Sequence, residues 1–302
     1  MKYRIYPGTL EIIMEAQDGI TDLNMLFDRL CLSRKDRYLY LQEGRITLNR
    51  IPARQADTAL AGSDRVRFHL IPEHLDRTPA SEPCEVIYSD DLIYVVHKEP
   101  GMIIHDDSED CLAARAAAWQ QLQGLDVPVR YIHRLDRETS GLVLFSKVPL
   151  LQGWYDNALR NRKIRRTYLA ISRGSMPAGQ HLHFADAIGK DRHVNGRYRV
   201  SPSGKPAATD VICLEKKGPF RLLECALETG RTHQIRVHLS AHGMPIVNDP
   251  LYGIPEPGFR HMGLWACRLQ TGNPFNAETI TVTDRIPEDF RQFKAAAQLE
   301  AT

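Results

Sequence analysis

The spacing of apolar residues predicts a small unit of helices and strands at the start of the chain. Leu26 and Leu30 lie one helical turn apart, and Ser33 is placed to cap a second helix behind them. Two runs of alternating apolar and polar residues follow, at 45–49 and 65–70, and alternation of this kind predicts strands. The unit therefore combines two helices with a small sheet.

A polar segment separates this unit from the rest of the chain. Residues 76–83, DRTPASEP, contain two prolines and no apolar run, a composition typical of linkers. A chain of 302 residues is long enough for about two domains. We therefore predict an N-terminal domain over residues 1–75, a linker over 76–83 and a larger domain over 84–302.

The larger domain is predicted to alternate short strands with a few helices. Strands are predicted at 85–88, 92–98, 142–145, 167–171 and 221–227. Helices are predicted at 110–122, 150–163, 232–242 and 287–299. Thr232 is placed to cap the third of these helices, and the last is interpreted as a surface helix. The stretch 174–206 is rich in loop residues and gives no clear prediction.

Composition narrows the class of protein. The formal net charge is only +2, so a nucleic-acid partner would have to be met by local basic patches. The six cysteines include no CxxC pair, which indicates reduced thiols in a cytoplasmic protein and no zinc site. The chain contains no run of about 18 apolar residues, so no membrane span is predicted. The first residues also lack the apolar core of a signal peptide.

The segment YIHRLDRETSGLVLFSK, residues 131–147, places a carboxylate in a polar loop that leads into an apolar strand. Asp136 lies between Arg134 and Arg137, and nearby opposite charge favours its ionised form. Such an anion could act as a nucleophile or as a base. A single Asp in a loop more often caps a turn, and the spacing alone leaves both interpretations open.

Two further residues are candidates for chemistry. Arg236 lies on the predicted helix at 232–242, where its guanidinium could bind a buried carboxylate or a phosphate. A solvated Arg fits the pattern equally well. Tyr168 opens an apolar strand after a basic cluster, where it could stack on a base or pack with its hydroxyl at the edge. His233 and His238 are five residues apart, which does not suit two metal ligands on one helical face.

Four segments, taken in order, resemble the RluA-type family of RNA pseudouridine synthases. The segments are Gly101 to His105, HRLDRETSGLVLFSK, Arg166-Thr-Tyr168-Leu-Ala170 and GRTHQIRVHLSAHGMPIVNDPLYG. The match covers about residues 84–275. The N-terminal unit resembles the alpha-L RNA-binding domain, with matches at Ser33-Arg34, Glu43-Gly44 and Gly62-Ser63-Asp64.

The resemblance implies an α+β catalytic domain with a largely antiparallel mixed sheet and a central active cleft, preceded by a small α/β RNA-binding domain. It implies isomerisation of uridine to pseudouridine in structured RNA, without metal or cofactor. Asp136 would be the catalytic carboxylate, Arg236 its paired cation, and Tyr168 the residue that stacks on uracil. Arg134 would fill the space left by the extruded uridine. Further RNA contacts would come from His133, Arg165, Arg166, Arg231, Arg34 and Lys35.

Departures from the family pattern and rival functions remain open at this level. The chain has Lys98-Glu99-Pro100-Gly101 where the family has Lys-Pro-x-Gly, and Leu264-Trp265-Ala266 where it has Leu-His-Ala. Large-subunit ribosomal RNA is the favoured target, and transfer RNA is the alternative. The protein is expected to be a monomer. One rival is a non-catalytic RNA-binding protein in ribosome assembly. The other is a glycoside hydrolase, which needs a second carboxylate, and Glu138 is the nearest candidate.

Overall fold

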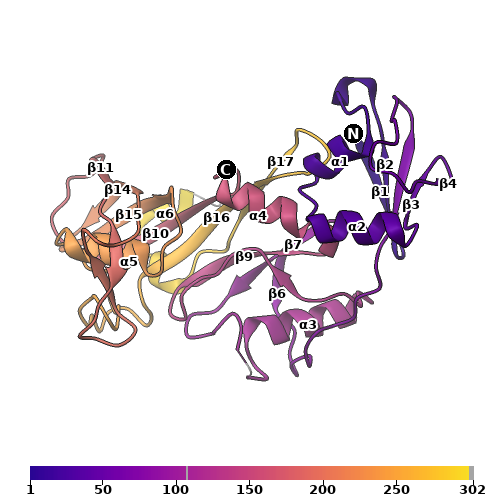
Figure 1. The fold of residues 1–302 in the computed structure, drawn as a ribbon. Coiled ribbons are helices and arrows are strands. Elements are labelled where there is room, and N and C mark those ends of the chain that lie inside the picture. Colours follow the sequence, from indigo (N-terminus) through magenta and orange to yellow (C-terminus); the bar gives the residue numbers. More distant parts are fainter. Residues whose placement is uncertain (107, 299–302) are drawn as a thin grey trace.

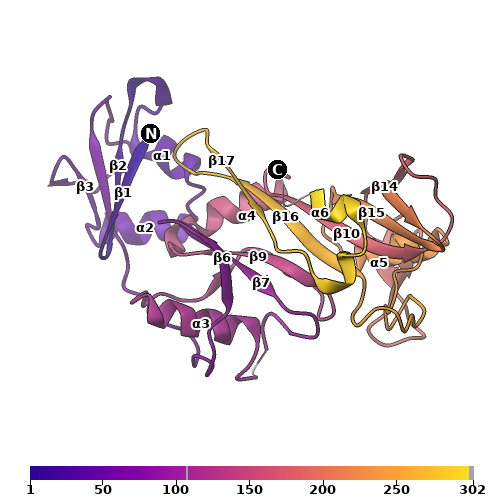
Figure 2. The same cartoon turned by 180° about the vertical axis from the view of Figure 1, so that it is seen from behind.

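The computed structural model describes residues 1–106 and 108–298. The chain forms an elongated molecule, with a small sheet at one end and α5 (Gln234–Ala241) beside the far strands of a large sheet at the other (Figures 1 and 2). The predicted α+β class is confirmed, because few helices cover a large, mostly antiparallel sheet. No helix among the described residues is long and apolar enough to span a membrane.

The small sheet has five strands in the order β1-β2-β5-β3-β4. Its strands are β1 (Lys2–Tyr6), β2 (Thr9–Ile13), β3 (Ile46–Leu48), β4 (Ile51–Pro52) and β5 (Arg65–His69). Helices α1 (Leu23–Arg29) and α2 (Arg34–Gln42) pack on it, and Ser33 caps α2 as predicted by accepting from the Asp36 N–H. The hairpin of β1 and β2 was not predicted.

The core of the small sheet continues into the large sheet. Phe27 and Phe68 belong to the same buried cluster as Leu142 and Leu269. The ring of Tyr3 lies 4.8 Å from that of Phe275 at the junction. The division of the chain at a 76–83 linker stays a prediction, and the apolar contact across the junction shows that the two sheets share packing.

The large sheet has ten strands, and eight of them follow the order β11-β14-β15-β10-β16-β9-β7-β6. Its first strands in the chain are β6 (Glu85–Ser89), β7 (Ile93–Lys98), β8 (Arg130–Tyr131) and β9 (Ser140–Ser146). The later ones are β10 (Arg165–Arg173), β11 (His181–Phe184), β14 (Thr209–Lys217), β15 (Phe220–Leu227), β16 (Leu264–Gly272) and β17 (Thr279–Thr283). β16 and β9 pair in parallel at the centre, and the other pairs are antiparallel.

The helices of the large unit are α3 (Leu112–Leu122), α4 (Gln152–Arg160), α5 and α6 (Lys294–Ala297). The predicted helix at 150–163 is wrong at its end, because Arg162 has a left-handed φ of 59° and turns the chain. The predicted Thr232 cap is also wrong. The residue that precedes α5 is His233, with φ 56°, and no side chain caps the helix.

The predicted surface helix at 287–299 is wrong in form and in position. Among the described residues of this tail, the chain makes a short 3-10 helix over Glu288–Phe290 and then α6. Phe290 and Phe293 are buried in a cluster with Trp265. The apolar residues of this tail therefore pack onto the sheet and do not belong to a solvated helix. Leu299 lies outside the described residues. The cysteines are all free, and five of them are buried, as the sequence indicated.

Candidate active site

Lys98, the last residue of β7, stabilises the loop that carries Asp136. The side chain of Lys98 is fully buried, and its Nζ donates to the carbonyls of Glu99, Met102 and Arg137, each at 2.9 Å. Burial lowers the pKa of Lys98 to about 7, while the charges of Glu138 and Asp136 oppose that shift. Three carbonyls match the three N–H donors of an ammonium group. Lys98 therefore joins the end of β7 to the Asp136 loop.

Gly141 fixes the path of the chain as it leaves this loop. Its φ is +117°, and it pairs with Ala266 where β9 and β16 run in parallel. A Cβ at this position would lie 2.7 Å from the Ala266 nitrogen, so only glycine permits the two strands to approach this closely. The loop is thus constrained at both ends by the sheet.

Asp136 and Arg236, predicted to pair across the sequence, are in contact. Arg236 Nη1 donates to Asp136 Oδ2 at 3.0 Å. The other edge of the guanidinium faces Asp249, with Nε to Oδ2 at 2.8 Å and Nη2 to Oδ1 at 2.9 Å. Burial opposes the charge of Arg236, but Asp249 and Asp136 raise its pKa. Two carboxylates share one guanidinium, so the trio keeps a net negative charge.

Asp249 was not identified from the sequence, although it lies in the quoted NDPLYG segment. It is buried, and its Oδ1 also accepts the backbone N–H groups of Leu251 and Tyr252, at 3.0 and 3.2 Å. These bonds hold Asp249 behind Arg236. Asp136 is on the open side, where its side chain is 25% exposed.

Tyr168, on β10, is also part of the site. The residue is buried, and it lines the same cleft as Asp136. Burial raises the pKa of its phenol, Arg166 opposes the shift, and Asp136 adds to it. The phenol is therefore neutral near pH 7.

The cleft has a volume of about 1130 Å³, and Asp136, Tyr168 and Arg236 all line it. Its further cations are Arg134, Arg137, Arg160, Arg162, Arg166 and Arg231. Lining carboxylates are fewer, namely Glu138, Asp156 and Glu228 in addition to Asp136. The cleft is therefore locally basic, although the net charge of the whole chain is small.

The arginines next to Asp136 in sequence are not its partners. Arg134 is exposed, and Arg137 Nε donates to the Gly101 carbonyl at 3.0 Å. His133 is buried, and its Nε2 accepts the Leu144 N–H at 3.3 Å. Burial lowers the pKa of His133 to about 3, and Arg166 adds to this effect. His133 is thus a neutral support of the loop.

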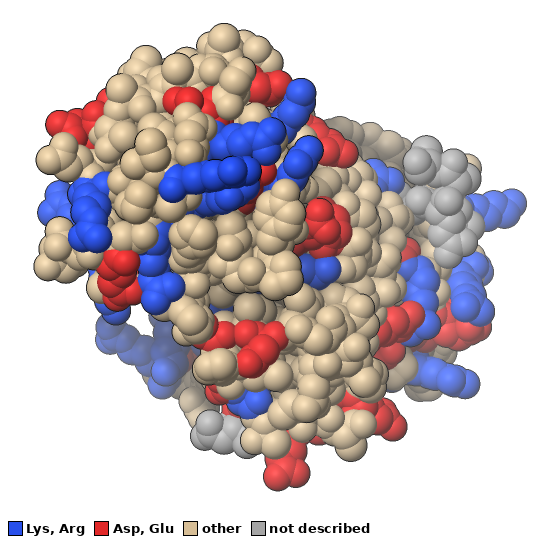
Figure 3. Space-filling model, turned by 90° about the vertical axis from the view of Figure 1, so that its right-hand side faces the viewer, with Lys and Arg blue, Asp and Glu red and all other residues tan. Residues whose placement is uncertain are grey.

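The other residues predicted to contact RNA lie in three places. Arg166 and Arg231 line the cleft, whereas Arg165 starts β10 as an exposed residue outside the cleft lining. Arg34 and Lys35 are exposed on the first turn of α2. On the side of the molecule that carries the small sheet, Lys and Arg side chains gather on the surface (Figure 3).

The Trp265 departure is accommodated by a buried carboxylate. Trp265 Nε1 donates to Asp284 Oδ2 at 2.8 Å, and His97 Nδ1 lies 2.8 Å from the same oxygen. Burial opposes protonation of His97, but Asp284 raises its pKa. Trp265 therefore has a hydrogen-bond partner and keeps β16 in contact with the end of β7.

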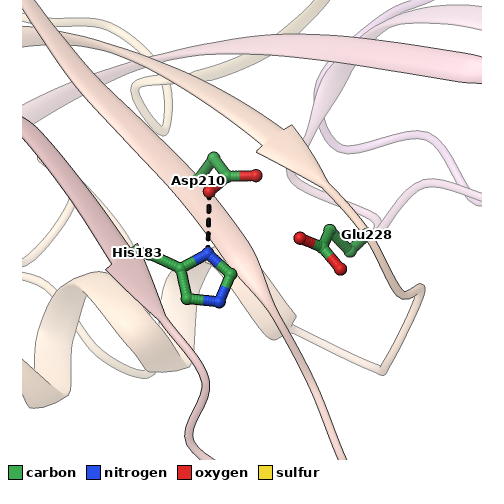
Figure 4. Close-up of side chains that lie close together, drawn as sticks. All are labelled: His183, Asp210 and Glu228. Carbon is green, nitrogen blue, oxygen red and sulfur yellow. Dashed lines mark hydrogen bonds and ion pairs between the residues drawn. The ribbon is translucent and has the colours of Figure 1, made fainter.

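A group of possible metal ligands lies outside the cleft lining, except for Glu228. One ligand atom each of His183, Asp210 and Glu228 lies within 4.8 Å of the others (Figure 4). His183 Nδ1 is hydrogen-bonded to Asp210 Oδ1 at 2.8 Å, and Arg162 Nη1 donates to Glu228 Oε2 at 2.7 Å. Protein partners thus satisfy these groups, and the cluster by itself gives no reason to assign a metal.

Comparisons with known proteins identify the family of this chain. The sequence profile of the RNA pseudouridylate synthase family matches residues 92–241. The chain is 31% identical over 290 residues to "Ribosomal large subunit pseudouridine synthase D" of Neisseria meningitidis, covering 89% of this chain and 76% of the relative. It is 32% identical over 291 residues to the Xanthomonas campestris protein of the same name, covering 90% of this chain and 86% of the relative.

A solved structure shows the same fold. The "Human RNA Pseudouridylate Synthase Domain Containing 1" superposes with a TM-score of 0.58 at 26% identity, covering 75% of this chain and 98% of that one. The ordered motifs, the fold and the relatives all lead to one assignment. This chain belongs to the RluA-type family of RNA pseudouridine synthases, which are isomerases that act on RNA.

Proposed function

We propose that this protein isomerises specific uridines of large-subunit ribosomal RNA, and that Asp136 is its single catalytic carboxylate. The observation that carries the proposal is the arrangement of Asp136, Arg236 and Asp249 in a basic cleft. Asp249 already compensates the charge of Arg236, so Arg236 can orient Asp136 without neutralising it. An oriented anion in a partly desolvated cleft suits nucleophilic or general-base chemistry.

The reaction breaks the bond between uracil N1 and ribose C1′ and forms a bond from C1′ to uracil C5; C5 loses a proton and N1 gains one, so the product is an isomer of the substrate. A stacked base cannot present this glycosidic bond, so the uridine has to be extruded. Tyr168 supports a stacking role, because its neutral ring lines the cleft beside Asp136. Arg134, exposed at the cleft, supports a role in filling the vacated position in the RNA.

The choice of ribosomal RNA rests on two supports. Several relatives carry the name "Ribosomal large subunit pseudouridine synthase D". The exposed cations Arg34 and Lys35 on α2 fit an RNA-binding surface next to the catalytic unit. Pseudouridine maps of cells with and without the protein test this choice. We expect a site to be lost from large-subunit RNA, and loss from transfer RNA alone would contradict the proposal.

Tritium release tests the catalytic role. An RNA labelled with tritium at uridine C5 loses the label when C5 bonds to the ribose. We expect wild-type protein to release tritium and Asp136→Asn to lose at least about a thousandfold in rate. Asp210→Asn, which removes an exposed carboxylate outside the cleft lining, is the control and should retain activity. Equal, negligible release from all three proteins would favour a non-catalytic RNA-binding protein.

A further inference from the structure

A basic segment beside the cleft takes no part in the chemistry described so far. β12 (Ile188–Lys190) and β13 (Tyr198–Val200) form a hairpin, and the chain then returns along β12 as far as Lys205. We call residues 188–205 the 188–205 arm. Its exposed cations are Lys190, Arg192, Arg199 and Lys205.

The protein leaves the charge of this arm largely uncompensated. The arm contains five Lys and Arg residues against one acid, Asp191. Asp191 accepts the His193 N–H at 2.9 Å, and that bond together with the charges of Arg199 and Arg197 lowers its pKa, so this single carboxylate offsets only part of the positive charge. Among the residues that the structure describes, no carboxylate lies within ion-pair distance of the four exposed cations. Unpaired surface cations of this density attract phosphates, since they release counterions from the nucleic acid on binding.

The base of the arm has a fixed shape. The main chains of Ile188 and Lys205 exchange two hydrogen bonds of 2.9 Å. Gly204 allows this close return, because a Cβ there would lie 2.6 Å from the Ile188 carbonyl oxygen. Just beyond the arm, the Pro206 carbonyl accepts Nε of Arg231 at 2.9 Å, and Arg231 lines the cleft. The cations are therefore presented at a set position relative to the cleft.

The inner side of the arm contacts residues that lead to Asp136. The Tyr198 N–H donates to the Tyr252 hydroxyl at 2.7 Å, and the Arg197 guanidinium lies 5.4 Å from the Tyr252 ring centre. The same hydroxyl is 2.9 Å from His233 Nδ1. On the far side of the imidazole, His233 Nε2 lies 4.0 Å from Asp136 Oδ2.

These contacts favour one tautomer of His233. The Tyr252 oxygen already accepts from Tyr198, so its own hydrogen is available to donate to His233 Nδ1. Burial raises the pKa of Tyr252 and lowers that of His233, which agrees with a neutral phenol and a neutral imidazole. In this tautomer the imidazole hydrogen lies on Nε2, the nitrogen that faces the Asp136 carboxylate at 4.0 Å.

The backbone of His233 supports a special role for this residue. Its φ of 56° lies in the left-handed region, which is unfavourable for a residue other than glycine. This conformation places the ring between Tyr198 and Tyr252, with both ring centres 5.6 Å away in edge-to-face geometry. Strain of this kind persists where the surrounding contacts hold it, often at functional sites.

We propose that the 188–205 arm binds phosphates of the substrate RNA beside the target uridine, and that its contacts through Tyr252 and His233 hold the Asp136 carboxylate in position. The outer side of the arm thus contributes affinity, and its inner side makes His233 a positioning residue. The proposal rests on the proposed function, since it concerns the RNA and the carboxylate of the same site.

Binding of an unmodified large-subunit ribosomal RNA transcript tests the outer side. The measurement uses the full chain with Asp136→Asn, so that no turnover intervenes. The added pair Arg192→Gln and Arg199→Gln should raise Kd about tenfold and lower the salt slope of log Kobs by roughly 1.5 between about 50 and 200 mM salt. Lys216→Gln is the matched control, because this exposed cation lies at the opposite end of β14 from the site. A pair variant that behaves like this control refutes phosphate binding by the arm.

Turnover tests the inner side. Tyr252→Phe removes the hydroxyl and leaves the ring, and His233→Asn keeps a residue type that tolerates the left-handed conformation. Each should lower kcat about tenfold while Kd for the transcript changes less than about twofold, a split that a merely structural role would not give. Unfolding midpoints confirm that both variants are folded. Full kcat in either folded variant refutes the positioning role.

These outcomes are separable from failure of the proposed function. A wild-type protein that releases no tritium from ribosomal RNA contradicts the proposed function, while the salt slope still tests the arm. An active wild-type protein whose pair variant keeps Kd and salt slope unchanged contradicts the arm alone.

Discussion

Replacement of Arg236 by Lys tests whether the shape of the guanidinium, and not only its charge, organises the site. Arg236 spans two carboxylates, with Asp249 on one edge at 2.8 and 2.9 Å and Asp136 on the other at 3.0 Å. Lys carries its donors on one nitrogen and cannot bridge both groups. We expect the ammonium to stay with Asp249, which is buried, and to release Asp136, which is partly exposed.

The magnitude follows from the bond that is lost. A hydrogen bond between charged groups contributes about 1.5–3 kcal/mol, and each 1.4 kcal/mol or so corresponds to a factor of ten in rate. The Asp136 side chain is 25% exposed, so solvent screening favours the lower part of this range. We therefore expect kcat for Arg236→Lys to fall roughly tenfold to thirtyfold.

Single-turnover tritium release from a labelled ribosomal RNA transcript measures this rate. Arg221→Lys is the matched control, because Arg221 is also buried and its guanidinium donates three hydrogen bonds. Its acceptors are the carbonyls of Met176, Gly218 and Phe220, outside the cleft lining. The control should lose stability and keep its rate. Equal rates for the two variants would show that Arg236 does not orient Asp136.

Three further changes test the supports of the site. Gly141→Ala should lower the unfolding free energy by about 3 kcal/mol in denaturant titrations, because the new Cβ meets β16. Gly179→Ala shares a positive φ but has open space, so it should lose only about 1 kcal/mol. Burial lowers the pKa of Lys98 in the folded protein to about 7, from an ordinary value of 10.5. Between about pH 7 and pH 10.5 the unfolded chain therefore binds more protons at Lys98 than the folded chain does. The unfolding free energy of the wild type should rise with pH over this range relative to that of Lys98→Met, and a constant difference between the two proteins would contradict this. Trp265→Phe leaves Asp284 without one donor and should cost about 1–2 kcal/mol, and an unchanged unfolding midpoint would show that this bond contributes nothing.

Several elements were predictable because their signals are local. Ser33 caps α2 as expected, since a cap depends on residues three positions apart. The β1–β2 hairpin also had a signal, namely the turn residues Pro7-Gly8 between alternating runs. The 188–205 arm had no such signal. Its strands are short, and no apolar pattern of their own stabilises them. Contacts with Tyr252 and with the segment that returns to Lys205 stabilise them instead.

The sequence by itself determined the chemical groups, their order and the family. It placed a carboxylate in a polar loop, a tyrosine at a strand start and an arginine on a helix 100 residues beyond the carboxylate. These are local facts of composition and spacing. Charge and spacing alone left Arg134 and Arg137 as possible partners of Asp136, and the resemblance to the family pointed instead to Arg236.

Only the tertiary structure showed that Arg236 is shared with a second carboxylate, Asp249, and where the arginines adjacent to Asp136 lie. The folding of α5 against the sheet buries Arg236 between Asp136 and Asp249. Arg134 stays exposed, and Arg137 turns to the Gly101 carbonyl. Charges interact more strongly where water is excluded, so the buried arginine and not the adjacent ones sets the orientation of the carboxylate. Burial is a property of the whole fold, and residue spacing along the chain does not encode it.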